Sequence, residues 1–150
     1  IIVLISVMAQ AGAISVSAFA KSWHDEGNYN DKHEWIGASY SIYEDNKYEY
    51  GVEYANFKNS YSDNTNMIVG YGTRYLYDND KFKIGATLSG GLQQGYCLSG
   101  LDTVPCEGKE KHITPVIIPS LTIKYDRLSV DVAVIPNAVV TRFKYIVWRF

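Results

Sequence analysis

The segment KFKIGATL (81–88) alternates between apolar and polar or small side chains, and this alternation constrains the fold more than any other feature of the sequence. In an extended chain one face carries Phe82, Ile84, Ala86 and Leu88, and the other carries Lys83, Gly85, Thr87 and Ser89. RLSVDVAV (127–134) and KYEYGVEY (47–54) repeat the pattern. A period of two residues indicates β-strands. Mean hydropathy is only −0.14 although 47% of the residues are hydrophobic, because apolar and polar residues are interleaved.

Eight segments of this kind follow one another from Gly12 onward, and none has convincing helical periodicity. The predicted strands are about 13–23, 34–43, 47–57, 65–77, 81–93, 112–125, 127–136 and 138–150. Eight is the smallest strand number that is common among closed outer-membrane barrels. The sequence therefore predicts an all-β fold, an eight-stranded antiparallel transmembrane β-barrel formed by residues 12–150.

The lengths of the predicted connections favour a membrane barrel. Three turns on one side are short: EDN (44–46), DND (78–80) and DR (126–127). On the other side, 24–33, 58–64 and 94–111 are longer, and Pro136-Asn137 is the fourth connection. Outer-membrane barrels have short periplasmic turns and longer outer loops. We expect the outer membrane of a Gram-negative bacterium as the location.

Alternation alone fits a soluble barrel equally well, because only the direction of the apolar face differs. Aromatic residues near strand ends and the final YIVWRF (145–150) favour the membrane. The apolar faces would then meet lipid, and we expect Trp35 and Trp148 to be interface anchors. In the lumen, Glu49, Glu53 and Asp131 are expected to be balanced by Lys83, Arg74 and Arg142.

The first eleven residues, IIVLISVMAQA, are expected to be the remnant of a signal peptide. The apolar run ends at Ala9-Gln10-Ala11, a small-x-small cleavage pattern before Gly12. A cut after Ala18-Phe19-Ala20 would remove most of the first predicted strand, so we favour Gly12 as the mature start. The apolar run is too short for a membrane anchor, which needs about 20 residues.

Two cysteines, Cys97 and Cys106, lie in one predicted outer loop. Export permits a disulfide, and two thiols alone make a poor metal site, so we expect a single structural bridge. The formal net charge is −2, which gives no broad basic surface for nucleic acid. We expect no metal, and a monomer.

His24 and Ser60 are the candidate reactive residues, since both are expected at outer strand ends. An imidazole that takes the hydroxyl proton while the oxygen attacks a carbonyl is the minimum for acyl transfer. A simpler interpretation is that Asn59-Ser60 ends a strand and orders a loop, because both residue types are favoured in turns. His33 and His112 fall at loop edges and are expected at the surface.

Several short motifs, in order along the chain, carry a resemblance to a known family. They are SWH (22–24), YN (29–30), FKNSY (57–61), GYG (70–72), TPVIIPSLTIKYDRLSVDVAVIP (114–136) and YIVWRF (145–150). The chain resembles the PagP family of outer-membrane lipid A palmitoyltransferases over nearly its whole predicted mature length. The paired proline-containing strands are the most specific part of this resemblance.

The resemblance implies an eight-stranded barrel that moves a palmitoyl chain from a phospholipid to lipid A without a cofactor. The family's essential His and Ser fall on His24 and Ser60, with Tyr61 beside them. The prolines that open a lateral lipid gate fall on Pro119 and Pro136. The glycine that floors the acyl-chain site falls on Gly72, one residue further from the Ser than in the family.

Asn59 departs from the family pattern, because an essential Asp stands there in PagP. Asn can orient a neighbour but cannot stabilise an imidazolium by charge. Asp25 and Asp63 are the nearby carboxylates that could replace it.

Two hypotheses follow. The first is a phospholipid:lipid A acyltransferase using His24, Ser60 and Asn59. The second is a non-catalytic small barrel that modifies or binds at the cell surface through the Cys97–Cys106 loop. A lateral opening beside an apolar upper lumen would favour the enzyme, and a lumen filled with charge to the top would favour the second. A pore is not expected, because side chains fill an eight-stranded barrel.

Overall fold

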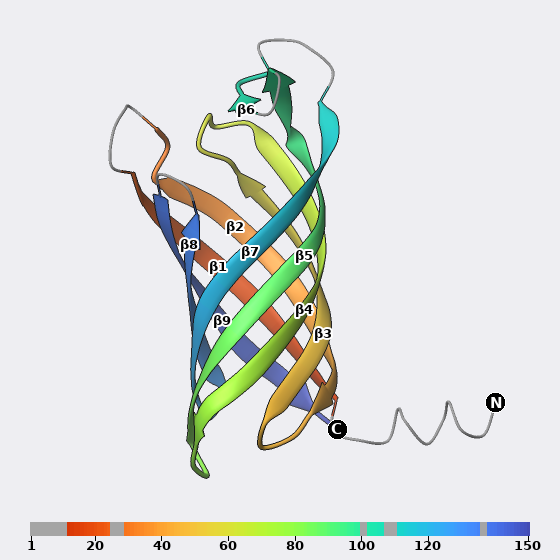
Figure 1. The fold of residues 1–150 in the computed structure, drawn as a ribbon, viewed down its shortest axis with the longest axis vertical. Coiled ribbons are helices and arrows are strands. Elements are labelled where there is room, and N and C mark those ends of the chain that lie inside the picture. The colour runs from red at the N-terminus through yellow and green to blue at the C-terminus, as the bar shows by residue number, and fades with distance from the viewer. Residues whose placement is uncertain (1–11, 25–28, 100–101, 107–110, 136–137) are drawn as a thin grey trace, which may run out of the picture.

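The computed structural model describes residues 12–24, 29–99, 102–106, 111–135 and 138–150. These residues form nine β-strands (Figure 1). Their bounds are β1 Ala13–His24, β2 Lys32–Glu44, β3 Tyr48–Lys58, β4 Asn64–Asp78, β5 Phe82–Ser99, β6 Asp102–Val104, β7 His112–Tyr125, β8 Leu128–Ile135 and β9 Ala138–Arg149. Within this described part of the chain, no helix is long and apolar enough to cross a membrane. The predicted signal remnant, residues 1–11, lies outside it.

Eight of the strands close into an antiparallel barrel. Each pairs with its neighbour along the chain, and pairing of β1 with β9 completes the circle. The predicted eight-stranded barrel is therefore confirmed. The structure corrects one region: β5 continues to Ser99 rather than ending near residue 93, and the short β6 folds back onto it. The predicted disulfide between Cys97 and Cys106 is present there.

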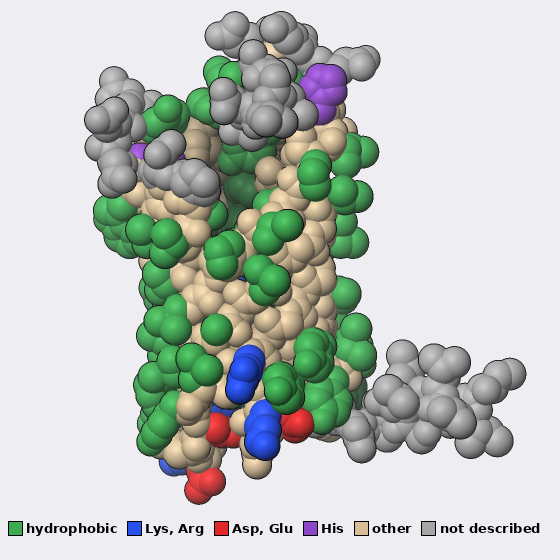
Figure 2. Space-filling view, in the orientation of Figure 1, with side chains coloured by type: hydrophobic (Ala, Val, Ile, Leu, Met, Phe, Trp, Pro, Cys, Tyr) green, Lys and Arg blue, Asp and Glu red, His purple; other side chains and the backbone are tan. Residues whose placement is uncertain are grey.

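The barrel has its apolar side chains outside and its polar side chains inside. Ile36, Ile68 and Ile117 are exposed, whereas Thr73, Thr87 and Ser89 are buried in the lumen. Hydrophobic side chains cover much of the visible outer surface (Figure 2). A soluble barrel would show the reverse arrangement. The structure thus supports the predicted choice of a lipid-facing apolar surface.

Ion pairs cross the middle of the lumen. Arg142 bridges Glu53 and Asp131 through N–O distances of 2.7 and 2.6 Å, and Lys144 contacts the same two carboxylates at 3.1 and 3.0 Å. The predicted acidic residues do lie inside. Two of the predicted partners were wrong: Arg74 is exposed on the outward side of β4, and Lys83 pairs with Glu44 and Asp78.

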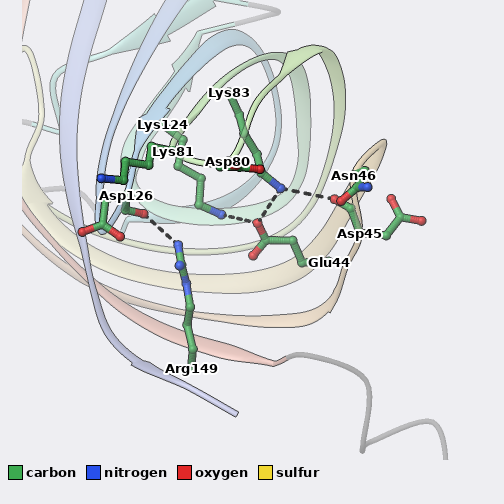
Figure 3. Close-up of a pocket in the computed structure, with 9 residues that line it drawn as sticks. All are labelled: Glu44, Asp45, Asn46, Asp80, Lys81, Lys83, Lys124, Asp126 and Arg149. Carbon is green, nitrogen blue, oxygen red and sulfur yellow. Dashed lines mark hydrogen bonds and ion pairs between the residues drawn. The ribbon is translucent and has the colours of Figure 1, made fainter.

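The end of the barrel that carries the short turns, here called the turn end, is lined by charge. A cavity of about 280 Å³ opens there, and opposite charges point toward one another across it (Figure 3). Lys124 and Lys83 both contact Glu44 Oε1, at 2.8 and 3.3 Å. Paired charged side chains therefore line the cavity at this end of the lumen.

Asp45 shapes the turn between β2 and β3. It accepts hydrogen bonds from the Tyr43 hydroxyl at 2.6 Å and from the backbone N–H groups of Lys47 and Tyr48 at 2.7 and 2.6 Å. The Tyr43 hydroxyl first, and then these two N–H groups, lower the pKa of Asp45 below its ordinary value, because all three favour the ionised carboxylate. The turn is thus fixed by its own side chain.

At the opposite end, here called the loop end, β7 and β8 separate. Their pairing runs from Tyr125↔Leu128 to Ser120↔Ala133 and goes no further among the described residues. Pro119 is the next residue of β7, and it has no N–H to offer a ladder. In Figure 1 the outer parts of β7 and β8 lean to different sides, and Figure 2 shows the surface hollowed between them with hydrophobic side chains inside.

Removal of Arg142 should destabilise the barrel strongly. Arg142→Ala leaves Glu53 and Asp131 buried with Lys144 as their one remaining cation among the described residues, and breaking a buried ion pair costs about 3–5 kcal/mol. Arg74→Ala is the matched control, because Arg74 is exposed, and should change the unfolding free energy by less than about 0.5 kcal/mol. Urea unfolding in lipid bilayers measures both. Equal effects of the two variants would contradict this account of the lumen.

Candidate functional site

A β-bulge in β1 places the candidate site inside the barrel. Phe19 has a positive φ of 60°, and the register of β1 against both neighbours shifts between Ala18 and Ala20. Before the bulge Ser15 and Ser17 face the lumen, and after it Ser22 and His24 do. Strict alternation continued from Ser17 without a bulge would instead turn Ser22 and His24 toward lipid. Bulges are frequent next to functional sites because they re-aim side chains.

Beyond the bulge, one serine stands between two histidines. The Ser22 hydroxyl oxygen lies 2.9 Å from His24 Nε2 and 2.8 Å from His33 Nε2. His33 Nδ1 lies 2.6 Å from the backbone carbonyl oxygen of Lys58 on β3. Ser22 and His33 are buried, whereas His24 is partly exposed. The prediction that His33 is a surface residue was wrong, because β2 turns its side chain into the lumen.

An apolar cluster lies directly beneath these histidines. It consists of Ala55, Phe57, Met67 and Val69, with Trp35, Val116 and Ile118 packed against them. The Phe57 ring meets His33 edge-on at 6.3 Å and stacks on Trp35 at 4.5 Å. Trp35 donates to Ser17 Oγ at 2.8 Å, so its prediction as an interface anchor was wrong. Trp148 is exposed, as that prediction required.

The lumen is therefore layered along the barrel axis. The Arg142 guanidinium lies 5.2 Å from the Trp35 ring, which joins the charged middle to the apolar cluster. The cluster then meets His33, which bonds to Ser22 and so to His24. Val116 and Ile118 belong to the part of β7 that has lost its pairing with β8. The apolar layer is thus adjacent to the separated strands.

Asn59 is fully buried, and its side chain holds the loop between β3 and β4 together. Its Oδ1 accepts from the N–H groups of Tyr61 and Asp63 at 2.9 and 3.0 Å, and its Nδ2 donates to the Gly95 carbonyl at 2.9 Å. Gly95 has a φ of +155°, and a Cβ there would collide with Thr65, so this close approach requires glycine. These contacts give Asn59 a structural role in the loop.

Ser60 is half-buried in the same loop. Its backbone carbonyl accepts from the Asn30 N–H at 2.9 Å, and both its backbone and its side chain contact the Tyr96 hydroxyl. No hydrogen bond between Ser60 and His24 occurs among the described residues. A row of rings links the two regions: His24 to Tyr29 at 4.8 Å, Tyr29 to Tyr61 at 5.9 Å, and Tyr61 to Tyr96 at 6.2 Å.

The other predicted site residues lie in different surroundings. Pro119 stands where β7 and β8 separate, and Pro136 is outside the described residues. Gly72 lies on the outward side of β4, where a Cβ would meet the exposed Tyr50 ring at 3.3 Å. The lumen position beside it belongs to Tyr71, whose hydroxyl donates to Glu49. Gly72 therefore cannot floor a site inside the barrel, because strand alternation points it at lipid.

Of the carboxylates that could replace an Asp at position 59, Asp63 contacts the Cys106 N–H, and Asp25 lies outside the described residues. His112 is exposed, as predicted. In the part of the chain that the structure describes, no group of three or more His, Cys, Asp or Glu side chains could hold a metal ion.

Comparison with known proteins identifies the fold. Ail, the attachment invasion locus protein of Yersinia pestis, is similar with a TM-score of 0.54 and 12% identity, over 95% of this chain and 100% of Ail. The chain is a small outer-membrane β-barrel. The closed fold and its apolar exterior place it in the outer membrane of a Gram-negative bacterium.

Two further Ail structures are also similar. One, in complex with the heparin analogue sucrose octasulfate, gives a TM-score of 0.48, 10% identity and coverage of 93% of this chain and 98% of Ail. The other, of Ail in a phospholipid bilayer nanodisc, gives a TM-score of 0.48 and 11% identity, with coverage of 94% of this chain and 99% of Ail. The sequence matches no protein-family model and no curated protein.

Asn59→Asp separates a structural role of this residue from a catalytic one. The substitution keeps the two accepted hydrogen bonds but sets a carboxylate oxygen against the Gly95 carbonyl, at a fully buried position. We expect a loss of about 1–3 kcal/mol in unfolding free energy and no gain in acyl transfer. Bilayer unfolding and lipid A analysis measure the two effects. Unchanged stability with raised transfer would instead identify position 59 as catalytic.

Proposed function

We propose that this barrel is an acyltransferase that moves a fatty acyl chain from a phospholipid to lipid A in the outer leaflet. The single observation that carries the proposal is the separation of β7 and β8 at Pro119, beside an apolar layer that contacts His33, which is joined to His24 through Ser22. An acyl chain in the bilayer needs an apolar path to a reactive group. The loop end of the barrel offers such an apolar path, and a chain that followed it would not cross the charged layer of the lumen.

The position of the charges supports the same function. They occupy the middle and the turn end of the lumen, so an acyl chain entering at the loop end would lie on Phe57, Met67 and Val69. Trp35 and Arg142 would limit how far it descends, because a buried ion-paired guanidinium disfavours hydrocarbon contact. The preferred chain length would then depend on Trp35 rather than on Gly72.

In this proposal His24 is the general base and Ser60 remains the candidate nucleophile. The motifs shared with the PagP family support both assignments, with Tyr29 and Tyr61 lying between the two residues. Because His24 and Ser60 have no direct bond in the described structure, the bound lipids would have to draw them together. Catalytic hydrogen bonds are often long before substrate binds. No cofactor is needed for transfer between two lipids.

A non-catalytic barrel that binds at the cell surface is the second candidate. Its supporting observations are the structural use of Asn59 and the likeness of the fold to Ail, an attachment invasion locus protein. The β5–β6 hairpin with its Cys97–Cys106 bridge would be the binding element. This candidate requires no contact between His24 and Ser60.

Mass spectrometry of lipid A from Gram-negative cells that express the exported chain tests the proposal. We expect a mass increase equal to one acyl chain, and a loss of about 100-fold or more with His24→Ala or Ser60→Ala, because a general base contributes roughly 10²–10⁴ in rate. Ser62→Ala is the matched control, since Ser62 is an exposed serine of the same loop. Unchanged lipid A from a folded barrel would reject the acyltransferase and favour the second candidate.

A further inference from the structure

Ser22 and His33 form a buried polar pair that the proposed reaction does not yet use. Ser22 is only 1% exposed and His33 8%, and His33 also meets the Phe57 ring of the apolar cluster edge-on. Buried polar groups in folded proteins are nearly always hydrogen-bonded. Here His33 bonds to Ser22, and Ser22 in turn bonds to the Nε2 atom of His24.

When both histidines are neutral, their hydrogen-bond partners fix the position of every proton in this chain of groups. The Lys58 carbonyl can only accept, so His33 Nδ1 carries a proton and donates. In a neutral His33 the Nε2 atom then accepts, which makes the Ser22 hydroxyl its donor. Ser22 Oγ has spent its one proton, so it must accept from His24 Nε2. A neutral His24 is left with its lone pair on Nδ1.

We propose that Ser22 and His33 are positioning residues that hold His24 in the Nε2–H tautomer, so that Nδ1 is the atom that takes the proton. The proposal rests on the acyltransferase function for its chemistry, whereas the tautomer itself stands on the geometry alone. It assigns to a serine and a second histidine the orienting role that a carboxylate has in many acyl-transfer sites. Asn59 cannot have that role, because its side chain is fully engaged in the loop.

The chemical step balances with these groups. His24 Nδ1 takes the Ser60 hydroxyl proton as Ser60 Oγ bonds to the ester carbonyl carbon of the phospholipid. The ester C–O bond then breaks, and the leaving lysophospholipid oxygen takes that proton from His24. A lipid A hydroxyl next attacks the acyl-Ser60 ester while His24 Nδ1 takes its proton, and the leaving Ser60 oxygen recovers a proton from His24. While His24 is charged, its Nε2–H donates to Ser22 Oγ, and the Ser22 hydroxyl donates its own hydrogen bond to His33 Nε2. A chain of polarised hydrogen bonds strengthens each member, which stabilises the imidazolium.

The tautomer can be observed directly, without any activity. ¹⁵N NMR of the imidazole nitrogens, in the folded barrel labelled at histidine, distinguishes a protonated from an unprotonated nitrogen. We expect a protonated Nε2 in His24 and a protonated Nδ1 in His33. A wild-type His24 with a bare Nε2 would overturn the proposal at once, whatever the lipid analysis shows.

Substitutions of Ser22 supply the second readout. Ser22→Ala should return His24 to a mixture of tautomers, whereas Ser22→Thr keeps the hydroxyl and should preserve the wild-type signals. Ser89→Ala is the matched control, because Ser89 is a buried lumen serine on β5 with no bond to either histidine. Unaltered His24 signals in Ser22→Ala would contradict the positioning role. Should Ser22→Ala fail to fold, His33→Gln removes the imidazole partner of Ser22 and is read in the same way.

Kinetics then connect the tautomer with transfer. We expect Ser22→Ala to lower kcat by about 10- to 100-fold with little change in KM, and Ser22→Thr to restore most of it, since the lost bond is to a group charged only during reaction. Equal kcat in wild type and Ser22→Ala would overturn the catalytic part. Labelling of Ser22 by a lipid phosphonate would make it the nucleophile and also overturn the proposal. Wild-type protein with the expected tautomer but no transfer would refute the proposed function alone.

Discussion

The requirement that a barrel in lipid pairs all of its backbone groups governs this structure. No water is available in the hydrocarbon core, so each unsatisfied N–H or C=O costs several kcal/mol, and closure removes every edge. Seven of the eight strand contacts of the barrel obey this rule over most of their length. The exception, between β7 and β8, begins at Pro119, and Pro115 stands further along the part of β7 that pairs with β5 but not with β8. Proline reduces the cost of an open edge because it has no N–H to leave unsatisfied.

The unpaired edge of β7 lies next to the apolar layer of the lumen, because Val116 and Ile118 on that edge pack against it. In the lumen the charges sit in the middle and at the turn end, and an apolar layer separates them from the histidines. The apolar layer lies at the height of the separated strands, next to the buried His33; in the proposed function a bilayer chain would enter there and His24 would be the reactive group. The bulge at Phe19 completes this arrangement by turning Ser22 and His24 inward.

Strand positions and their faces could be read from the sequence because the period of two is fixed by backbone geometry. Glu49, Glu53 and Asp131 were placed in the lumen for that reason. The bulge at Phe19 could not be read, because an exposed Phe with positive φ has no sequence signature. His33 and Trp35 were misplaced because the predicted second strand began at residue 34, so that both looked like end-of-strand residues rather than lumen residues. Gly72 was assigned from a short sequence motif, and such a motif does not show which residues of a strand face the lumen and which face lipid.

One measurement tests most directly whether a lipid chain enters the barrel through the opening between β7 and β8. Trp35 lies in the apolar layer, and in a variant with Trp23→Phe and Trp148→Phe it is the one tryptophan left. In bilayers of phospholipid brominated on the acyl chain, we predict quenching of Trp35 fluorescence. A disulfide that joins β7 to β8, made by Ile118→Cys and Ile135→Cys, should abolish that quenching. Trp35 fluorescence that is insensitive to brominated lipid, with the strands unlocked and the barrel folded, would contradict this account.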